Sequence, residues 1–125
     1  MSSPLFTAVE NNDLPLVKSL LNQGVSPNFN QDHPQNWMPL HEACKRNLTE
    51  FALELINYNA NVNAIIKVGA YNVNYTPLHF AAFNNNVELV KLLLRANADK
   101  TIENIYGQTP VDLTTSQEIL NLLNC

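Results

Sequence analysis

The sequence predicts an all-α repeat solenoid, in which pairs of short helices stack side by side. The first observation is a proline at the start of each of four similar segments, at Pro4, Pro39, Pro77 and Pro110. The second is the spacing of these prolines, 35, 38 and 33 residues, which is typical of arrays that repeat one supersecondary unit. The third is the helical spacing of apolar residues within the segments.

Each unit is expected to begin with a helix whose first position is a proline. Proline suits this position because its missing N–H has no partner in the first turn of a helix. Thr76 and Thr109 precede it as N-caps, and Ser3 does so in the first unit. Met38 takes this place in the second unit, and we expect it to weaken that cap by about 1 kcal/mol unless burial of its side chain offsets the loss.

The two helices of each unit are expected to end at residues that tolerate a left-handed backbone. Glycine is the usual residue there because it has no Cβ, and asparagine is the next most tolerant. Asparagine takes five of the six positions, so the turns are kept although the chain has only three glycines. The aligned positions are Asn12, Asn47 and Asn85 after the first helices, and Gly24, Asn59 and Asn97 after the second.

The second helix of each unit carries an apolar face that packs on its neighbours. In the third unit Val87, Val90 and Leu94 show the helical spacing of such a face. The fourth unit opens in the same way as the others, but its second helix, at 117–123, begins early, with Ser116 as the expected cap. An atypical last unit is expected where the outer face of an array meets water.

Composition and charge exclude several classes of protein. Apolar residues make up 46% of the 125 residues, which argues for one folded domain and against disorder. The net charge of −4 and the scattered basic residues argue against nucleic-acid binding. No apolar run is as long as a membrane span, and no secretory signal is visible. We therefore expect an intracellular protein, cytoplasmic or nuclear, that does not bind membranes.

The sequence contains no motif of a known catalytic or metal site. It lacks a paired-cysteine motif, a zinc-protease helix, a phosphate-binding loop and a nucleophile with a base at a recognisable spacing. Cys44 aligns with Ala82 and is expected to be a small buried filler. We therefore predict that the protein is not an enzyme and has no catalytic residues, no metal and no cofactor.

Two of the repeated segments are similar to a known family. The third begins Thr-Pro-Leu-His-Phe-Ala-Ala at 76–82, and the second begins Met-Pro-Leu-His-Glu-Ala-Cys at 38–44. With this motif and this period, the chain resembles ankyrin-repeat proteins from Ser3 to Leu123. The resemblance implies helix-loop-helix units joined by β-hairpin fingers in a single domain over 1–125. The units are expected at about 3–35, 36–72, 73–106 and 107–125.

The resemblance also implies a concave binding face made of the fingers and the first helices. It predicts a non-enzymatic module, a monomer on its own, that binds a protein or peptide partner in this groove. Trp, Tyr and Arg, which are enriched among binding hot spots, occur at several of the aligned groove positions. The residues predicted to contact a partner are Glu10, Trp37, Glu42, Lys45, Arg46, Tyr71, Tyr75, Phe80, Phe83 and Tyr106. In ankyrin arrays the rings of His41 and His79 would instead form hydrogen bonds that tie the units together.

The connection at 65–75 is the main irregularity of the array, because it makes the second spacing five residues longer than the third. It is largely apolar, and Tyr71, Val73 and Tyr75 alternate as residues on one face of a strand do. Two interpretations remain open. Its apolar residues pack on a neighbouring finger, or it protrudes as a contact element for a partner.

A narrower resemblance concerns the segment Trp-Met-Pro-Leu-His-Glu-Ala-Cys that begins at Trp37. It is similar to a segment of ankyrin domains that bind unmodified histone H4 tails. Trp37, His41 and Glu42 match residues that in those domains help form an acidic cradle for a lysine. Lys45 and Arg46 depart from it, because positive charge beside the cradle opposes lysine binding. A histone-tail reader is one alternative function, and a structural subunit of a larger assembly is another.

Overall fold

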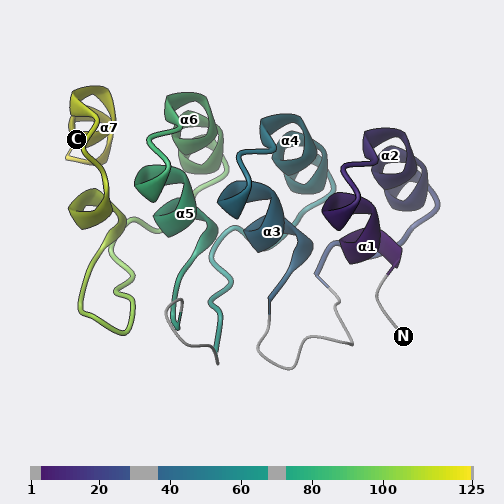
Figure 1. Cartoon of the computed structure of the whole chain (residues 1–125), viewed down its shortest axis with the longest axis horizontal. Helices are drawn as coiled ribbons and strands as arrows, with labels where there is room; N and C mark the ends of the chain where they lie inside the picture. Colours follow the sequence, from purple (N-terminus) through teal and green to yellow (C-terminus); the bar gives the residue numbers. More distant parts are fainter. Residues whose placement is uncertain (1–3, 29–36, 68–72, 125) are drawn as a thin grey trace.

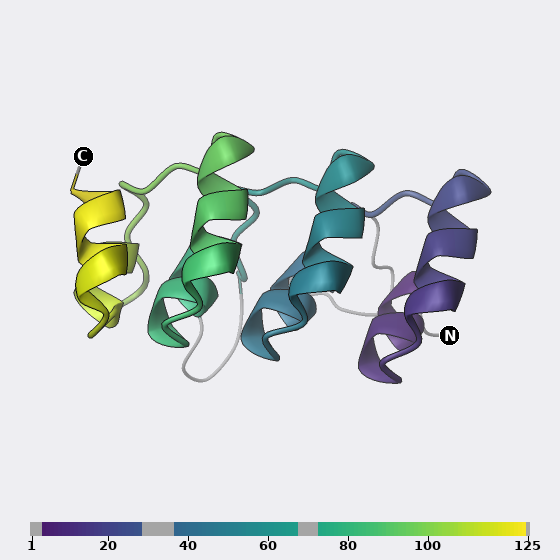
Figure 2. The ribbon, with the colours of Figure 1, turned by 90° about the horizontal axis from the view of Figure 1, so that it is seen from above.

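The computed structural model describes residues 4–28, 37–67 and 73–124, and within these ranges it contains helices and no β-strand. The helices come in pairs that stand side by side in chain order (Figure 1). Seen from above, the second helices of the pairs run nearly parallel to one another (Figure 2). The predicted helical repeat solenoid is confirmed.

Each pair consists of a first helix that starts at a proline and a second helix that follows a short turn. The first helices are α1 (Pro4–Glu10), α3 (Pro39–Lys45), α5 (Pro77–Phe83) and the short 3-10 helix η1 (Pro110–Leu113). The second helices are α2 (Leu14–Asn22), α4 (Thr49–Asn57), α6 (Val87–Arg95) and α7 (Gln117–Leu123). The first helices form one layer of the array and the second helices the other (Figure 1).

Of the predicted caps of the first helices, Thr76 is confirmed, Thr109 makes no side-chain capping hydrogen bond, and Ser3 lies outside the described residues. The Thr76 hydroxyl oxygen accepts from the backbone N–H of His79 at 3.2 Å. Met38 has no such oxygen, but its own backbone N–H donates to the Nδ1 of His41 at 2.9 Å. The imidazole thus satisfies one backbone donor at a start that lacks a side-chain cap. The second helices α2, α6 and α7 are capped by Asp13, Asn86 and Ser116.

The predicted left-handed helix ends are confirmed at all six positions. After the first helices the φ angles are 59° at Asn12, 61° at Asn47 and 56° at Asn85. After the second helices they are 96° at Gly24 and 69° at both Asn59 and Asn97. Asparagine therefore replaces the glycine that is usual at such helix ends, because its short polar side chain tolerates this backbone region.

Asn97 offers a clean test of this conclusion, because its exposed side chain makes no hydrogen bond with the described residues. Its backbone N–H closes the end of α6 on the carbonyl of Leu94 at 3.0 Å. We expect Asn97→Ala to lower the free energy of unfolding by about 1 kcal/mol, since alanine is strained at positive φ. Asn97→Gly should be nearly neutral. Urea denaturation of both variants measures the difference, and equal losses would contradict the assignment.

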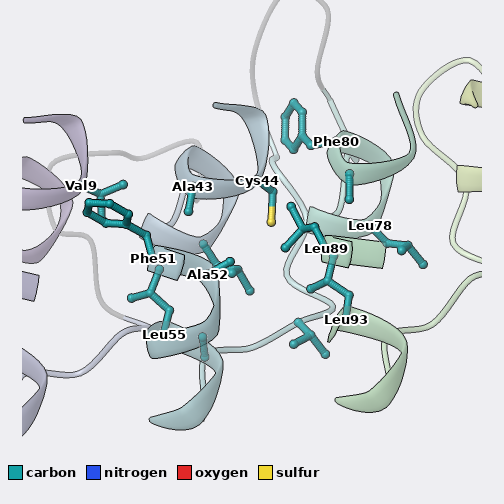
Figure 3. Packing of buried hydrophobic residues seen from close by; sticks show 14 of the residues in the cluster. Val9, Ala43, Cys44, Phe51, Ala52, Leu55, Leu78, Phe80, Leu89 and Leu93 are labelled. Atoms are coloured by element: carbon teal, nitrogen blue, oxygen red, sulfur yellow. The ribbon is translucent and has the colours of Figure 1, made fainter. Parts of the chain in front are cut away.

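A continuous apolar core lies between the two helical layers and between neighbouring units (Figure 3). Cys44 is part of it and is completely buried, as expected from its alignment with Ala82. Large side chains that are at most 1% exposed belong to this core, and these include Leu40, Leu55, Leu78, Leu89 and Leu93.

The fourth unit differs from the expectation that it opens like the others, because it begins with η1 in place of an α-helix. Thr114, directly after η1, is extended and its hydroxyl donates to Oδ1 of Asn85 at 2.7 Å. The backbone N–H of Thr115 donates to the same oxygen at 3.1 Å. These bonds to the third unit hold the chain out of helical geometry and let α7 begin early.

The connection before the third unit is closed at its base by two backbone hydrogen bonds. The N–H of Ile66 donates to the carbonyl of Tyr75 at 3.1 Å, and the N–H of Asn74 donates to the carbonyl of Ile66 at 2.6 Å. Ile66 is fully buried, and Val73 accepts from the N–H of Ile105 in the next connection at 3.1 Å. The base of the connection is therefore packed on its neighbours. The predicted β-hairpin form of the connections is not established, and 68–72 lie outside the described residues.

Candidate functional site

Three aromatic rings from two units meet beside the first-helix layer. Phe80, on α5, lies between the other two, with its ring centroid 5.8 Å from that of Trp37 and 5.1 Å from that of Tyr75. The Phe80 side chain is only 5% exposed, whereas Trp37 and Tyr75 are half-buried. Such tilted contacts are favourable between aromatic rings. Phe80 thus provides a fixed floor on which the two outer rings rest.

A cavity of about 220 Å³ opens beside this floor. Phe83, the last residue of α5, stands at its edge with 61% of its side chain exposed. The end of α3 contributes from the other side. The residues that line the cavity are Lys45, Tyr75, Phe80, Phe83 and Asn84. A concave surface lined mainly by aromatic rings, with few polar groups, is the arrangement common to ligand-binding sites.

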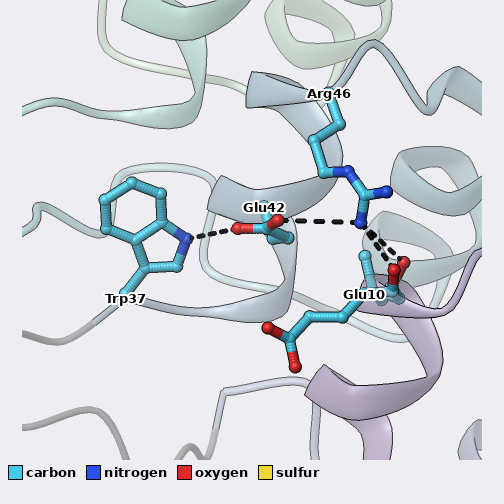
Figure 4. Close-up of polar contacts among 5 residues, drawn as sticks. Glu10, Trp37, Glu42 and Arg46 are labelled. Carbon is cyan, nitrogen blue, oxygen red and sulfur yellow. Dashed lines mark hydrogen bonds and ion pairs between the residues drawn. The ribbon is translucent and has the colours of Figure 1, made fainter.

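The charged residues around Trp37 are largely engaged with one another (Figure 4). The indole N–H of Trp37 donates to Oε1 of Glu42 at 3.0 Å, and Oε2 of Glu42 lies 3.7 Å from the guanidinium of Arg46. Lys45 lies against the ring of Trp37, with Nζ 5.0 Å from its centroid, which is a cation–π contact.

The residue that follows each of α3 and α5 links its helix to the first helix of the preceding unit. Arg46 donates to the carbonyls of Val9 and Glu10 at the end of α1, at 3.3 and 2.8 Å. Asn84, at the aligned place after α5, donates through Nδ2 to the carbonyls of Cys44 and Lys45 at the end of α3, at 3.1 and 3.0 Å. We call these contacts the inter-unit clamps. The carbonyls of Val9 and Cys44 also accept from the backbone N–H groups of Asn12 and Asn47, at 3.0 and 3.3 Å, whereas the clamps give those of Glu10 and Lys45 a partner at a helix end.

Comparison with known proteins agrees with this geometry. A family model for ankyrin repeats, in three copies, matches residues 5–123. The chain belongs to the ankyrin-repeat family. Ankyrin repeats are modules of protein–protein interaction and are generally not enzymatic.

Several relatives share this similarity over most of the chain. BCL-6 corepressor-like protein 1 of Homo sapiens is 33% identical over 99 residues, which are 79% of this chain and 5% of that protein. Ankyrin repeat and SOCS box protein 11 of Danio rerio is 33% identical over 123 residues, which are 98% of this chain and 39% of that protein. The crystal structure of the ankyrin repeat domain of Bcl-3 superposes with a TM-score of 0.80 at 26% identity, covering 97% of this chain and 50% of that one. The chain thus spans half or less of each of these relatives.

Both histidines of the ankyrin motif form a hydrogen bond to a backbone carbonyl, but only His79 reaches the next unit as predicted, because the partner of His41 lies within its own unit. His41 Nδ1 accepts from a backbone N–H, so its Nε2–H donates to the carbonyl of Ala64 at 2.8 Å. His79 donates in the same way to the carbonyl of Gln108 at 2.9 Å. Burial lowers the pKa of His41 to about 4 and also lowers that of His79, in each case against a smaller raising effect of the backbone hydrogen bond.

The last ankyrin connection presents a second exposed apolar group. Ile105 and Tyr106 are 54% and 57% exposed, and the buried Asn104 holds their turn by accepting from the Tyr106 N–H at 2.9 Å. Burial raises the pKa of the nearby Tyr75, and a hydrogen bond with Asn104 partly offsets this. Ile105 was not among the predicted contact residues, because its exposure follows from the fold of this turn.

The described parts of the ankyrin array contain no group of three or more side chains that could hold a metal ion, and none of their helices has the length and hydropathy of a membrane span. Burial raises the pKa of the Cys44 thiol strongly, so its thiolate, the nucleophilic form, is disfavoured.

The structure brings most of the predicted contact residues together, in different roles. Phe83 and Lys45 border the cavity, Trp37 and Tyr75 flank its floor, and Phe80 is buried beneath it. Glu42 and Arg46 face each other, Glu10 is exposed at the end of α1, and Tyr106 lies on the last connection. Tyr71 lies outside the described residues. Asn84, which also lines the cavity, lies at the groove position aligned with Arg46 but was not among the residues predicted to contact a partner.

Proposed function

We propose that this ankyrin array binds a protein or peptide partner in its concave groove, centred on the cavity between α3 and α5. The observation that carries the proposal is the exposed Phe83 ring beside a hollow whose floor is made of fixed aromatic rings. A hollow that is already formed is favourable for binding, because little conformational freedom of the protein is lost when a partner docks.

The residues proposed to contribute most are Trp37, Tyr75 and Phe83, since large aromatic residues dominate binding hot spots. Glu10 and Tyr106 would contact the partner farther along the groove. Glu42 and Arg46 would contribute less, because their charges already interact with each other and with the protein. We further propose that the four units act as one domain, monomeric on its own and independent of nucleic acid, membranes, metals and cofactors.

The test uses a partner captured from native extract on the intact chain and then purified. Phe83→Ala is expected to weaken its affinity by about 2 kcal/mol, or roughly thirtyfold, because it removes the exposed anchor. Isothermal titration calorimetry measures the change, and a Trp37→Ala variant should show a comparable loss.

Leu53→Ala is the matched control, because Leu53 is an exposed apolar residue on α4, in the layer of second helices. It should leave the affinity unchanged. If Phe83→Ala and Trp37→Ala both stay folded by circular dichroism and bind as tightly as this control, the groove is not the binding site.

A histone-tail reader is the weaker alternative on this geometry. In the present arrangement Lys45 lies on the face of Trp37 and Arg46 partly neutralises Glu42, so the cradle is already occupied by the chain's own cations. Titration with an unmodified H4-tail peptide tests it, and absence of binding at high micromolar concentration removes it. The alternative of a structural subunit predicts no free peptide ligand in any such titration.

A further inference from the structure

We propose that the partner presents an apolar side chain that enters the cavity and, within one or two residues of it, a carboxylate that pairs with Lys45. This inference rests on the proposed function and specifies the chemistry of the partner at the same site.

The size of the cavity favours a single side chain of a peptide. Its volume of about 220 Å³ is smaller than the roughly 300–1,000 Å³ of pockets that enclose whole drug-sized molecules. Its walls are mainly the rings of Tyr75, Phe80 and Phe83, so the inserted group is apolar or aromatic. Of the two other lining residues, Lys45 and Asn84, the second already uses its amide N–H groups in an inter-unit clamp. The floor therefore offers little to a polar group.

The charge at the rim of the cavity favours an acidic neighbour for that side chain. Lys45 lines the cavity, and among the described residues it has no carboxylate at ion-pair distance. The acidic residue on its own helix, Glu42, already accepts a hydrogen bond from Trp37 and forms an ion pair with Arg46. Lys45 instead lies on the Trp37 ring, and this contact holds its ammonium group beside the hollow. A carboxylate of the partner that follows the inserted side chain would form an ion pair with Lys45.

The overall charge of the chain limits how acidic the partner is. The net charge of −4 repels a long acidic segment, because the field of the whole protein acts over about a Debye length. One or two carboxylates next to the apolar residue would pair with Lys45 without this electrostatic repulsion. The proposed occupant is therefore a short acidic-apolar motif of a protein, rather than an acidic tail.

The experiment compares three libraries of random heptapeptides on the intact chain. Each library has Leu or Phe at the centre, and the two flanking positions are Glu in the first, Gln in the second and Lys in the third. We expect the Glu library to bind about twofold to fivefold more tightly than the Gln library, the range of an exposed ion pair, and the Lys library to bind least. Fluorescence anisotropy of the labelled libraries measures these ratios.

Lys45→Met should remove the preference for the Glu library over the Gln library, and Lys45→Glu should reverse the order of the Glu and Lys libraries. Lys18→Met is the matched control, because Lys18 is an exposed lysine on α2 that pairs with Glu54 at 3.9 Å. It should keep the preference.

Two failures are distinguishable. If the libraries bind in a Phe83-dependent manner but the Glu and Lys libraries bind equally, or Lys45→Met retains the preference, the acidic motif is wrong and the groove stands. If no library binds, or binding survives Phe83→Ala, the groove itself is wrong and the inference falls with it.

Discussion

Leu78→Ala is expected to lower the free energy of unfolding by about 3 kcal/mol, because it removes a fully buried side chain and leaves a cavity in a close-packed core. Leu78 lies on α5, which packs against α3, α6 and η1, so the loss occurs where the second, third and fourth units meet. In a repeat array, stability is a sum of unit terms and nearest-neighbour terms, and this substitution weakens both. Urea denaturation followed by circular dichroism measures the change.

Leu16→Ala is the control for this substitution, because Leu16 lies on α2 of the first unit and is 42% exposed. The same truncation should cost less than about 1 kcal/mol there, since little buried surface is lost. Similar losses for the two variants would mean that the core is not organised around α5. A loss at Leu78 without any change in the steepness of the transition would indicate that the array still unfolds as one cooperative unit.

Acidification from pH 7 to pH 4 is expected to destabilise the fold by roughly 3 kcal/mol through His41 alone. The pKa of this histidine falls from 6.5 to about 4 because its ring is buried, so the folded state excludes the proton that the unfolded state binds. The stabilisation is therefore complete above pH 6.5 and is lost as the pH falls toward 4, at up to about 1.4 kcal/mol per pH unit. His79, whose pKa is also lowered, acts in the same direction.

Unfolding free energies measured in urea at intervals between pH 7.5 and pH 4 test this expectation. A His41→Gln variant will be less stable at neutral pH, because it loses the bonds to Met38 and Ala64, but its stability should depend less on pH in this window. Asp99, whose pKa is lowered by hydrogen bonds from Thr101, loses its contribution mainly below pH 3.8, at the acidic edge of this window, and does so equally in the wild type and the variant. An unchanged slope in the variant would exclude His41 as the source.

Much of the fold could be predicted because its local signals agree with one another. A left-handed helix end favours glycine or asparagine, and these two residue types occupy all six aligned positions. The motif histidines could be predicted only in part, because each donates to a carbonyl of the connection that follows it, but the carbonyl lies 23 residues on for His41 and 29 residues on for His79. The 3-10 start of the fourth unit could not be predicted, since it depends on bonds from Thr114 and Thr115 to Asn85 in another unit.

The candidate site was predictable in position but not in role. Phe80 and Phe83 lie in the same helix and share one side-chain type, yet one is buried under Trp37 and the other is 61% exposed. Which phenylalanine is covered depends on contacts across units that the sequence pattern does not contain. The same is true of Arg46, which was predicted as a partner contact and donates to the carbonyls of Val9 and Glu10.

The inter-unit clamps have a consequence for how the units can be rearranged. Between the first and second units the clamp is a long arginine that also carries charge, and between the second and third it is a short asparagine. Both clamps nevertheless donate to the same two backbone carbonyls of the preceding helix end, because Val9 and Glu10 align with Cys44 and Lys45. The acceptors are therefore common to the units, and only the donor side chain differs. A unit moved to another place in an engineered array would meet the same acceptors, so its clamp would remain usable there.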